Sequence, residues 1–84
     1  MYDVLVERTA ERDLKHIPKE YFNRITYDIK ALSKNPRPHG CRKLSGSGRD
    51  WRIRVGDYRV IYEIDDRNML LKIMRVRHRR EVYR

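Results

Sequence analysis

The chain has 84 residues and a formal net charge of +9, from 21 lysines and arginines against 12 aspartates and glutamates. This length suits one small domain over residues 1–84, with a core that is marginal in size. The charge predicts attraction to nucleic acid, an acidic protein or an anionic membrane surface, although a basic surface that only confers solubility is the alternative.

Cysteine content and apolar runs exclude several classes of protein. The single Cys41 excludes an internal disulfide, and the scattered His16, His39 and His78 do not complete a zinc site with it. We therefore expect neither a metal nor another cofactor. The N-terminal residues do not resemble a signal peptide, and no segment reaches the length of a membrane span. These features predict a soluble cytoplasmic protein.

The first half of the chain predicts a strand followed by two helices. Residues 2–7 alternate valines on one side, as a strand does. Thr9 is placed to cap a short helix, and Pro18 suits the first position of a second one. Residues 19–34 repeat apolar side chains every three or four positions, which predicts an amphipathic helix that ends at Asn35. The repeating apolar residues are Phe22, Ile25, Ile29 and Leu32.

The second half predicts three strands after a polar connection. The connection covers residues 35–50 and is rich in glycine, proline and serine. Strand-like runs then cover residues 51–55, 58–64 and about 69–77. A strand, a two-helix hairpin and an antiparallel three-strand meander predict an α+β fold, in which one sheet carries the helices on one face.

The turn between the first two of these strands fixes their pairing. Gly56-Asp57 suits a two-residue type II′ turn, which sets Arg54 directly opposite Arg59. Alternation then places one set of side chains on the core face: Trp51, Ile53, Val55, Tyr58, Val60 and Tyr62.

The opposite face of this hairpin carries Arg52, Arg54 and Arg59. Directly opposed arginines destabilise a sheet unless something neutralises them. The guanidinium fork suits phosphate, so the pair predicts an anion site. The alternative is that both side chains splay into water and are screened there.

The third strand is expected to extend this face. A four-residue loop over residues 65–68 puts Arg59 opposite Met74. Alternation then places Met74, Val76 and His78 on the face of the arginines.

The chain ends in MRVRHRREVYR, which contains five arginines. A solvated tail is one interpretation, but the apolar pair Val82-Tyr83 indicates that the tail docks and brings Arg79 and Arg80 near the arginines. Alternation would place Arg79 on the core side, so the strand must end or bulge before it. Such cations could hold a phosphate and stabilise the charge that develops on it, while His78 moves a proton and Tyr83 stacks on a base.

The motif DYRVIYEI, followed by VRHRREVYR and preceded by KLSGSGRDWRIRVG and a two-helix half, resembles the RelE toxins of bacterial toxin–antitoxin pairs. These toxins belong to the wider RelE/ParE superfamily. The resemblance spans essentially the whole chain, and residues 43–83 are its specific part. It implies an mRNA interferase that enters the ribosomal A site and cuts the messenger without a metal. The ribose 2′-oxygen attacks the adjacent phosphate, which leaves a cyclic phosphate and a free 5′-hydroxyl.

The resemblance also implies roles for single residues. The two basic strand positions of the family, one of them the general base, correspond to Arg52 and Arg54. The phosphate-stabilising arginine corresponds to Arg59, the arginine near the leaving group to Arg79, and the base-stacking tyrosine to Tyr83.

One departure from the family pattern concerns the general base. The pattern has lysines where this chain has Arg52 and Arg54, and arginine stays protonated in almost any setting. Either Arg54 acts only electrostatically and His78 takes the proton, or the activity is weak. Arg79 and Arg80 could also exchange roles. The remaining basic residues are expected to contact RNA: Arg52, Arg77 and Arg80.

The partners implied are the ribosomal A site, mRNA and an acidic antitoxin of the RelB type, with no membrane. The antitoxin would wrap the basic surface, and either mask the arginines or displace the C-terminal segment. The toxin is expected to be monomeric alone and hetero-oligomeric with its antitoxin. The main rival is a ParE-like toxin that inhibits DNA gyrase without nuclease chemistry. A non-catalytic RNA-binding module and a chain that has lost its toxicity are further alternatives.

Overall fold

Our computed structural model describes residues 1–44, 46 and 48–82. The elements, in chain order, are β1 (Asp3–Val6), α1 (Arg8–Lys15), α2 (Lys19–Leu32), β2 (Arg42–Lys43), β3 (Asp50–Val55), β4 (Tyr58–Asp65), β5 (Leu70–His78) and α3 (Arg79–Val82). The strands form one sheet in the order β1-β5-β4-β3-β2. The predicted α+β fold is therefore confirmed. No helix in the described part of the chain is both long and apolar enough to cross a bilayer.

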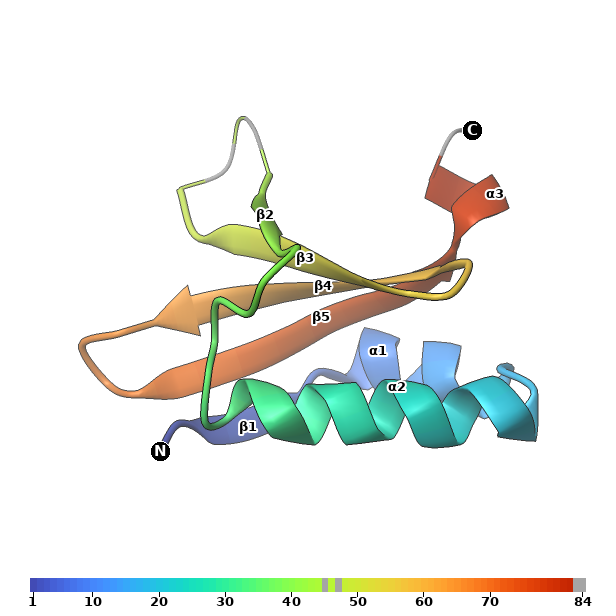
Figure 1. Ribbon diagram of the computed structural model, residues 1–84, viewed down its shortest axis with the longest axis horizontal. Coiled ribbons are helices and arrows are strands. Elements are labelled where there is room, and N and C mark those ends of the chain that lie inside the picture. Colours follow the sequence, from blue (N-terminus) through green and yellow to red (C-terminus); the bar gives the residue numbers. More distant parts are fainter. Residues whose placement is uncertain (45, 47, 83–84) are drawn as a thin grey trace.

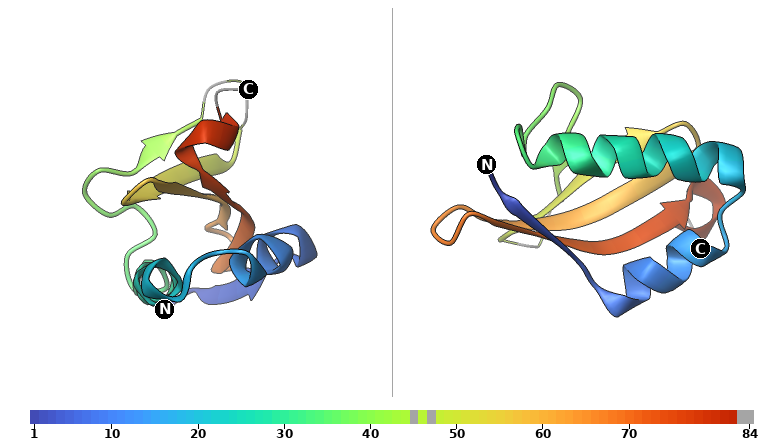
Figure 2. Two further views of the ribbon diagram at one scale, coloured as in Figure 1. Left: turned by 90° about the vertical axis from the view of Figure 1, so that its right-hand side faces the viewer. Right: turned by 90° about the horizontal axis from the view of Figure 1, so that it is seen from below.

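Helices α1 and α2 lie on one side of the sheet, and α3 lies on the other (Figures 1 and 2). Strand β1 pairs with β5 in parallel, whereas the pairings among β2, β3, β4 and β5 are antiparallel. The core between α2 and the sheet contains the predicted Ile25, Ile29 and Leu32, but Phe22 remains 37% exposed. Helix α1 contributes Ala10 to this core, and the sheet contributes Ile53, Val55, Val60, Tyr62, Ile64, Leu71, Ile73 and Val76.

The hairpin of β3 and β4 has the predicted register. Val55 pairs with Tyr58, and Arg54 pairs with Arg59. Gly56 has a φ of +60°, as the first central residue of a type II′ turn requires. Side chains along β3 and β4 therefore alternate as predicted, with core residues on one face of the hairpin and arginines on the other.

We expect Gly56→Ala to lower the free energy of unfolding by about 1 to 2 kcal/mol, because an L side chain is strained at this φ. An added Cβ would lie 3.6 Å from the Tyr21 ring, an ordinary contact, so the backbone causes the cost. Urea unfolding measures it. Gly48→Ala is the control, since Gly48 has open space and an ordinary φ. Equal losses in both variants would contradict this account of the turn.

The pairing of β4 with β5 differs from the prediction. Arg59 lies opposite Arg77 rather than Met74. One cause is the connecting loop, which starts later than expected because the ladder extends through Asp65. Met69 closes the loop with a φ of +53°.

A β-bulge at Met74 is the second cause. Tyr62 pairs with Ile73 and Ile61 pairs with Arg75, so Met74 is an extra residue in β5. A strand that carries one extra residue inverts its alternation beyond that point. The side chains of β5 therefore exchange faces after the bulge.

This exchange corrects two predictions. Val76 is 3% exposed in the core, and His78 pairs with Tyr58 on the side of the helices. The placement of Val76 and His78 on the face of the arginines was wrong. Arg75 and Arg77 occupy that face instead, because they pair with Ile61 and Arg59.

Two side chains of α1 form hydrogen bonds with the backbone of β5 at the bulge. Strand β1 ends opposite Ile73, so among the described residues no strand pairs with the rest of β5 on that side. The Thr9 hydroxyl donates to the carbonyl of Met74 at 2.8 Å, and Asp13 Oδ2 accepts the N–H of Val76 at 2.9 Å. Thr9 and Asp13 are one helical turn apart and so face the same way. Thr9 is therefore not the predicted cap; Glu7 occupies that position.

Asp66 joins three segments of the chain in a contact that depends on pH. It accepts hydrogen bonds from Arg37 at 3.2 and 2.8 Å and one from the Tyr2 hydroxyl. The Arg37 hydrogen bonds, followed by that of Tyr2, lower the pKa of Asp66 from 3.8 to about 2. Because the pKa is depressed in the folded state, the contact stabilises the protein fully above pH about 4 and is lost as the pH falls towards 2.

We therefore expect Asp66→Asn to lower the melting temperature at pH 7, with the difference from the wild type shrinking as the pH falls from 4 to about 2. Thermal unfolding at a series of pH values measures this difference. Asp3→Asn, on the exposed surface of β1, is the control. A difference that persists unchanged at pH 2 would show that the Asp66 charge is not the cause.

Candidate functional site

The side of the sheet away from α1 and α2 collects arginines from four strands. We call this surface the arginine face. Pairing places its members side by side in two rows, because directly paired residues project to the same side of a sheet. One row is Arg42, Arg52, Ile61 and Arg75, although the Arg75 guanidinium is held by Asp13 of α1. The other row is Arg54, Arg59 and Arg77.

The second row sets three guanidinium groups across three adjacent strands. Directly paired Cβ atoms lie about 5 Å apart, so the charges repel one another. Arg54 is exposed, and Arg59 and Arg77 are half-buried. A phosphate would offset this repulsion and match the planar fork of each arginine. By charge and by position, the row is therefore the candidate anion site.

A small cavity lies at the turn end of this row. Its volume is about 140 Å³, and we call it the arginine pocket. Its lining is Arg54, Gly56, Asp57, Tyr58, Arg59 and Arg79. The backbone N–H of Arg79 donates to the carbonyl of Asp57 at 2.7 Å, which fixes the start of α3 to the turn. The start of α3 thus lies at the hairpin, where Arg79 lines the same cavity as Arg54 and Arg59.

His78 and Arg80 line a different cavity, which also borders α1. This cavity, the histidine pocket, has a volume of about 700 Å³. Its lining is Asp13, His16, Ile17, Tyr58, Val76, His78 and Arg80. The His78 ring packs edge-on against Tyr58, with centroids 5.1 Å apart, and its Nδ1 accepts the N–H of Arg80 at 3.2 Å. Arg79 and Arg80 therefore line separate cavities.

Other predicted site residues have mixed outcomes. Arg52 and Arg77 lie on the arginine face, Arg52 beside Ile61 and Arg77 beside Arg59. Tyr83 lies outside the described residues. Arg42 was missed, because its two-residue strand lies in a segment that reads as a polar loop. The described residues include no group of histidine, cysteine, aspartate or glutamate side chains that could hold a metal ion.

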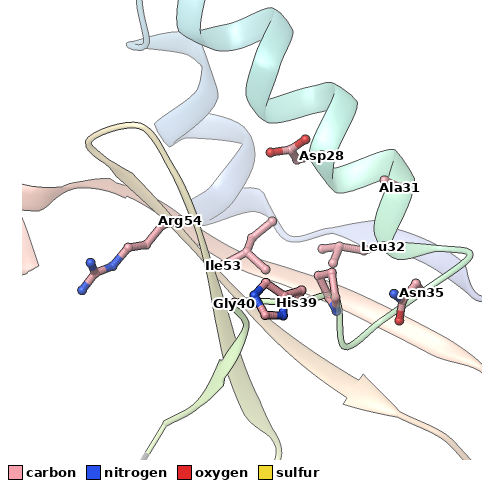
Figure 3. Close-up of a pocket in the computed structure, with 9 residues that line it drawn as sticks. Asp28, Ala31, Leu32, Asn35, His39, Gly40, Ile53 and Arg54 are labelled. Carbon is pink, nitrogen blue, oxygen red and sulfur yellow. The ribbon is translucent and has the colours of Figure 1, made fainter.

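Arg54 also borders a third cavity, of about 490 Å³, between α2, β3 and the segment that follows α2. Figure 3 shows its guanidinium directed away from Asp28 of α2 and from Leu32. Ala31, Leu32 and Ile53 give this cavity apolar walls. The charged end of Arg54 therefore lies away from this cavity.

Comparison with known proteins identifies relatives over nearly the whole chain. Residues 4–83 match the family model for the ParE toxin of the type II toxin–antitoxin system parDE. The chain is 34% identical to Toxin RelG of Mycobacterium tuberculosis, over 99% of this chain and 97% of that protein. It is 33% identical to Toxin RelE3 of Methanocaldococcus jannaschii, over 95% and 93%.

Solved structures of similar chains share the fold. The archaeal RelE–RelB complex from Pyrococcus horikoshii matches with a TM-score of 0.82 and 30% identity, over 93% of this chain and 94% of that one. The RelBE2 toxin–antitoxin complex from Mycobacterium tuberculosis matches with a TM-score of 0.82 and 31% identity, over 93% and 98%. The isolated RelE toxin of E. coli, at 20% identity, shares the fold with a TM-score of 0.81 over 99% and 92%.

Proposed function

Since this chain belongs to the ParE toxin family of type II toxin–antitoxin systems, with RelE and RelG toxins among its relatives, we propose that it is a ribosome-dependent mRNA interferase. The observation that carries the proposal is the row of Arg54, Arg59 and Arg77 with Arg79 at its end. This row offers several fixed cations to a single phosphate. Gyrase inhibition alone does not call for that arrangement.

The arginine pocket supplies the electrostatic part of the proposed reaction. The 2′-oxygen of the ribose forms a bond to phosphorus as the bond from phosphorus to the 5′-oxygen breaks. Negative charge builds on the non-bridging oxygens, and Arg59 and Arg79, which both line the pocket, stabilise it. The products are a 2′,3′-cyclic phosphate and a 5′-hydroxyl, which gains one proton while the 2′-hydroxyl loses one.

The next question is which group accepts the proton of the ribose 2′-hydroxyl. His78 lies in the histidine pocket, on the other side of the sheet from the arginine face. A guanidinium group donates hydrogen bonds and has no acceptor, so the role of Arg54 is electrostatic. We propose that solvent hydroxide removes the 2′-hydroxyl proton, and that the reaction is slower than in relatives with a lysine at this position.

Arg54→Lys is accordingly expected to raise the cleavage rate by about tenfold at pH 8, because a lysine can lose its proton when cations surround it. Single-turnover cleavage on programmed ribosomes measures this rate across pH 6 to 9. The wild-type rate should rise with pH over the whole range. A wild-type rate that levels off below pH 7 would point to a protein group as the base.

The partner proposed for this toxin is a RelB-like antitoxin. The relatives from Pyrococcus horikoshii and Mycobacterium tuberculosis were solved as complexes with their antitoxins. A net charge of +9 and an arginine face across β2, β3, β4 and β5 favour an acidic segment. Covering the arginine face would mask the site. The toxin is proposed to be a monomer without its antitoxin.

The second candidate function is ParE-like inhibition of DNA gyrase, which the name of the matching family model favours. The purified toxin should be added in parallel to a translation reaction and to a gyrase supercoiling reaction. Our proposal predicts that protein synthesis stops while supercoiling continues. Blocked supercoiling with unaffected translation would favour the ParE-like function.

A further inference from the structure

We propose that the histidine pocket binds a second phosphate of the same RNA strand, next to the phosphate held in the arginine pocket. The inference rests on the proposed function and extends it to the length of RNA that the toxin grips. The arginine and histidine pockets would then act together on one strand that passes the end of the sheet.

The two pockets have one lining residue in common. Tyr58 lines both of them, and the consecutive residues Arg79 and Arg80 each line one. The hydrogen bond from Arg79 to the Asp57 carbonyl and that from Arg80 to His78 fix both ends of this arrangement. Adjacent phosphates of one RNA strand can therefore meet one arginine each.

The histidine pocket offers donors of the kind that bind phosphate. The Arg80 guanidinium is a charged fork. The His78 Nδ1 accepts the N–H of Arg80, so in the neutral ring the hydrogen is on Nε2, which is a donor. His16, exposed at the C-cap of α1, also lines the cavity. These groups come from three different elements and surround one cavity.

Among the described residues that line this cavity, the one carboxylate is already neutralised. Asp13 accepts from Arg75 Nε at 2.9 Å and Nη2 at 3.2 Å, and from the backbone N–H of Val76. Its side chain is only 16% exposed. The charge that remains to attract a ligand is that of Arg80, with His16 and His78 beside it. An anion is thus the ligand that the pocket favours.

A nucleic acid fits better than an isolated anion, because the cavity of about 700 Å³ has a lining residue in common with the arginine pocket, at the same end of the sheet. A phosphodiester strand carries charges at a regular spacing and can occupy both pockets at once. Each phosphate contact adds to affinity without reading the base. The second contact would raise affinity and hold the scissile linkage in register.

The test uses ribosomes programmed with an A-site codon in which the linkages flanking the scissile phosphate are replaced in turn by a neutral methylphosphonate. One replacement is expected to raise the KM of the wild-type toxin about tenfold with little change in kcat, the scale of one charged hydrogen bond. Arg80→Ala and His16→Ala should raise the KM for unmodified RNA, and should respond less to that replacement. Arg80→Lys should recover part of the affinity.

The matched control is Arg12→Ala, which removes an exposed arginine from α1 that lines a separate cavity. It should keep the full response to the neutral linkage. If the neutral linkage raises the KM of Arg80→Ala as strongly as that of the wild type, the second phosphate is bound elsewhere. This inference then fails while the proposed function stands. If Arg80→Ala cleaves normally and binds the antitoxin more weakly, the pocket serves the antitoxin, which also overturns it. If the wild type leaves unmodified RNA uncut, the proposed function fails as well.

Discussion

Replacement of Arg59 by alanine is expected to lower the rate of the proposed cleavage by about 10²- to 10³-fold, the usual effect of removing a donor that stabilises charge in a transition state. Arg59 lies between Arg54 and Arg77 and lines the arginine pocket. Because Arg59 lies outside the apolar core, its replacement should change the free energy of unfolding by about 1 kcal/mol or less. Activity and stability are thus expected to separate at this residue.

Single-turnover cleavage and urea unfolding of the same preparation measure the two quantities. Arg59→Lys keeps the charge without the fork and should lie between the wild type and Arg59→Ala. Lys15→Ala removes one exposed positive charge from α1 and should leave cleavage within about twofold. An equal loss in Lys15→Ala would show that net charge matters and that the arginine row does not.

Asp13→Ala is expected to lower the free energy of unfolding by about 2 to 3 kcal/mol. The variant leaves Arg75 without its 2.9 Å ion pair and the backbone N–H of Val76 without its acceptor, beside the bulge. The cleavage rate should also fall, because the bulge decides that Arg77 reaches the arginine face. Chemical denaturation and single-turnover kinetics measure both effects.

Asp13→Asn separates the two contacts of this carboxylate. Its amide oxygen can still accept the N–H of Val76, whereas the ion pair with Arg75 is lost, so about half of the effect should remain. Asp3→Ala, at an exposed aspartate of β1, is the control and should be nearly neutral. Unchanged stability in Asp13→Ala would mean that core packing alone holds the bulge.

Local chemistry was sufficient to predict the hairpin that carries most of the candidate site. The Gly56-Asp57 turn fixes the register, and the period-two pattern of a strand then assigns every side chain to a face. The position of Arg52, Arg54 and Arg59 on one face follows from these two rules alone.

The strand β5 could not be predicted in the same way. Its bulge contacts Thr9 and Asp13, more than sixty residues earlier, and strict alternation ignores such contacts. One signal was present, since the apolar Ile73 and Val76 are three positions apart, a spacing that alternation does not allow without an extra residue. The extra residue, Met74, is the reason that His78 lies on the core face of the sheet rather than on the arginine face.

The positions of Arg79 and Arg80 also could not be predicted from alternation. The sequence left Arg79 and Arg80 interchangeable, because their separation depends on the bulge and on where β5 ends. In the structure the strand ends at His78, and the first turn of α3 sends the two arginines to different cavities. Arg42 joined the arginine face through a strand too short to leave a pattern.

The most direct test of the proposed function maps mRNA ends by primer extension on ribosomes that hold a defined codon in the A site. The wild-type toxin is predicted to create a new end within that codon, with a cyclic phosphate on the upstream fragment, and Arg59→Ala is predicted to leave the message intact. Message that stays intact with the wild-type toxin, while gyrase supercoiling is blocked, would contradict the proposal and assign the arginine face to a protein-binding role.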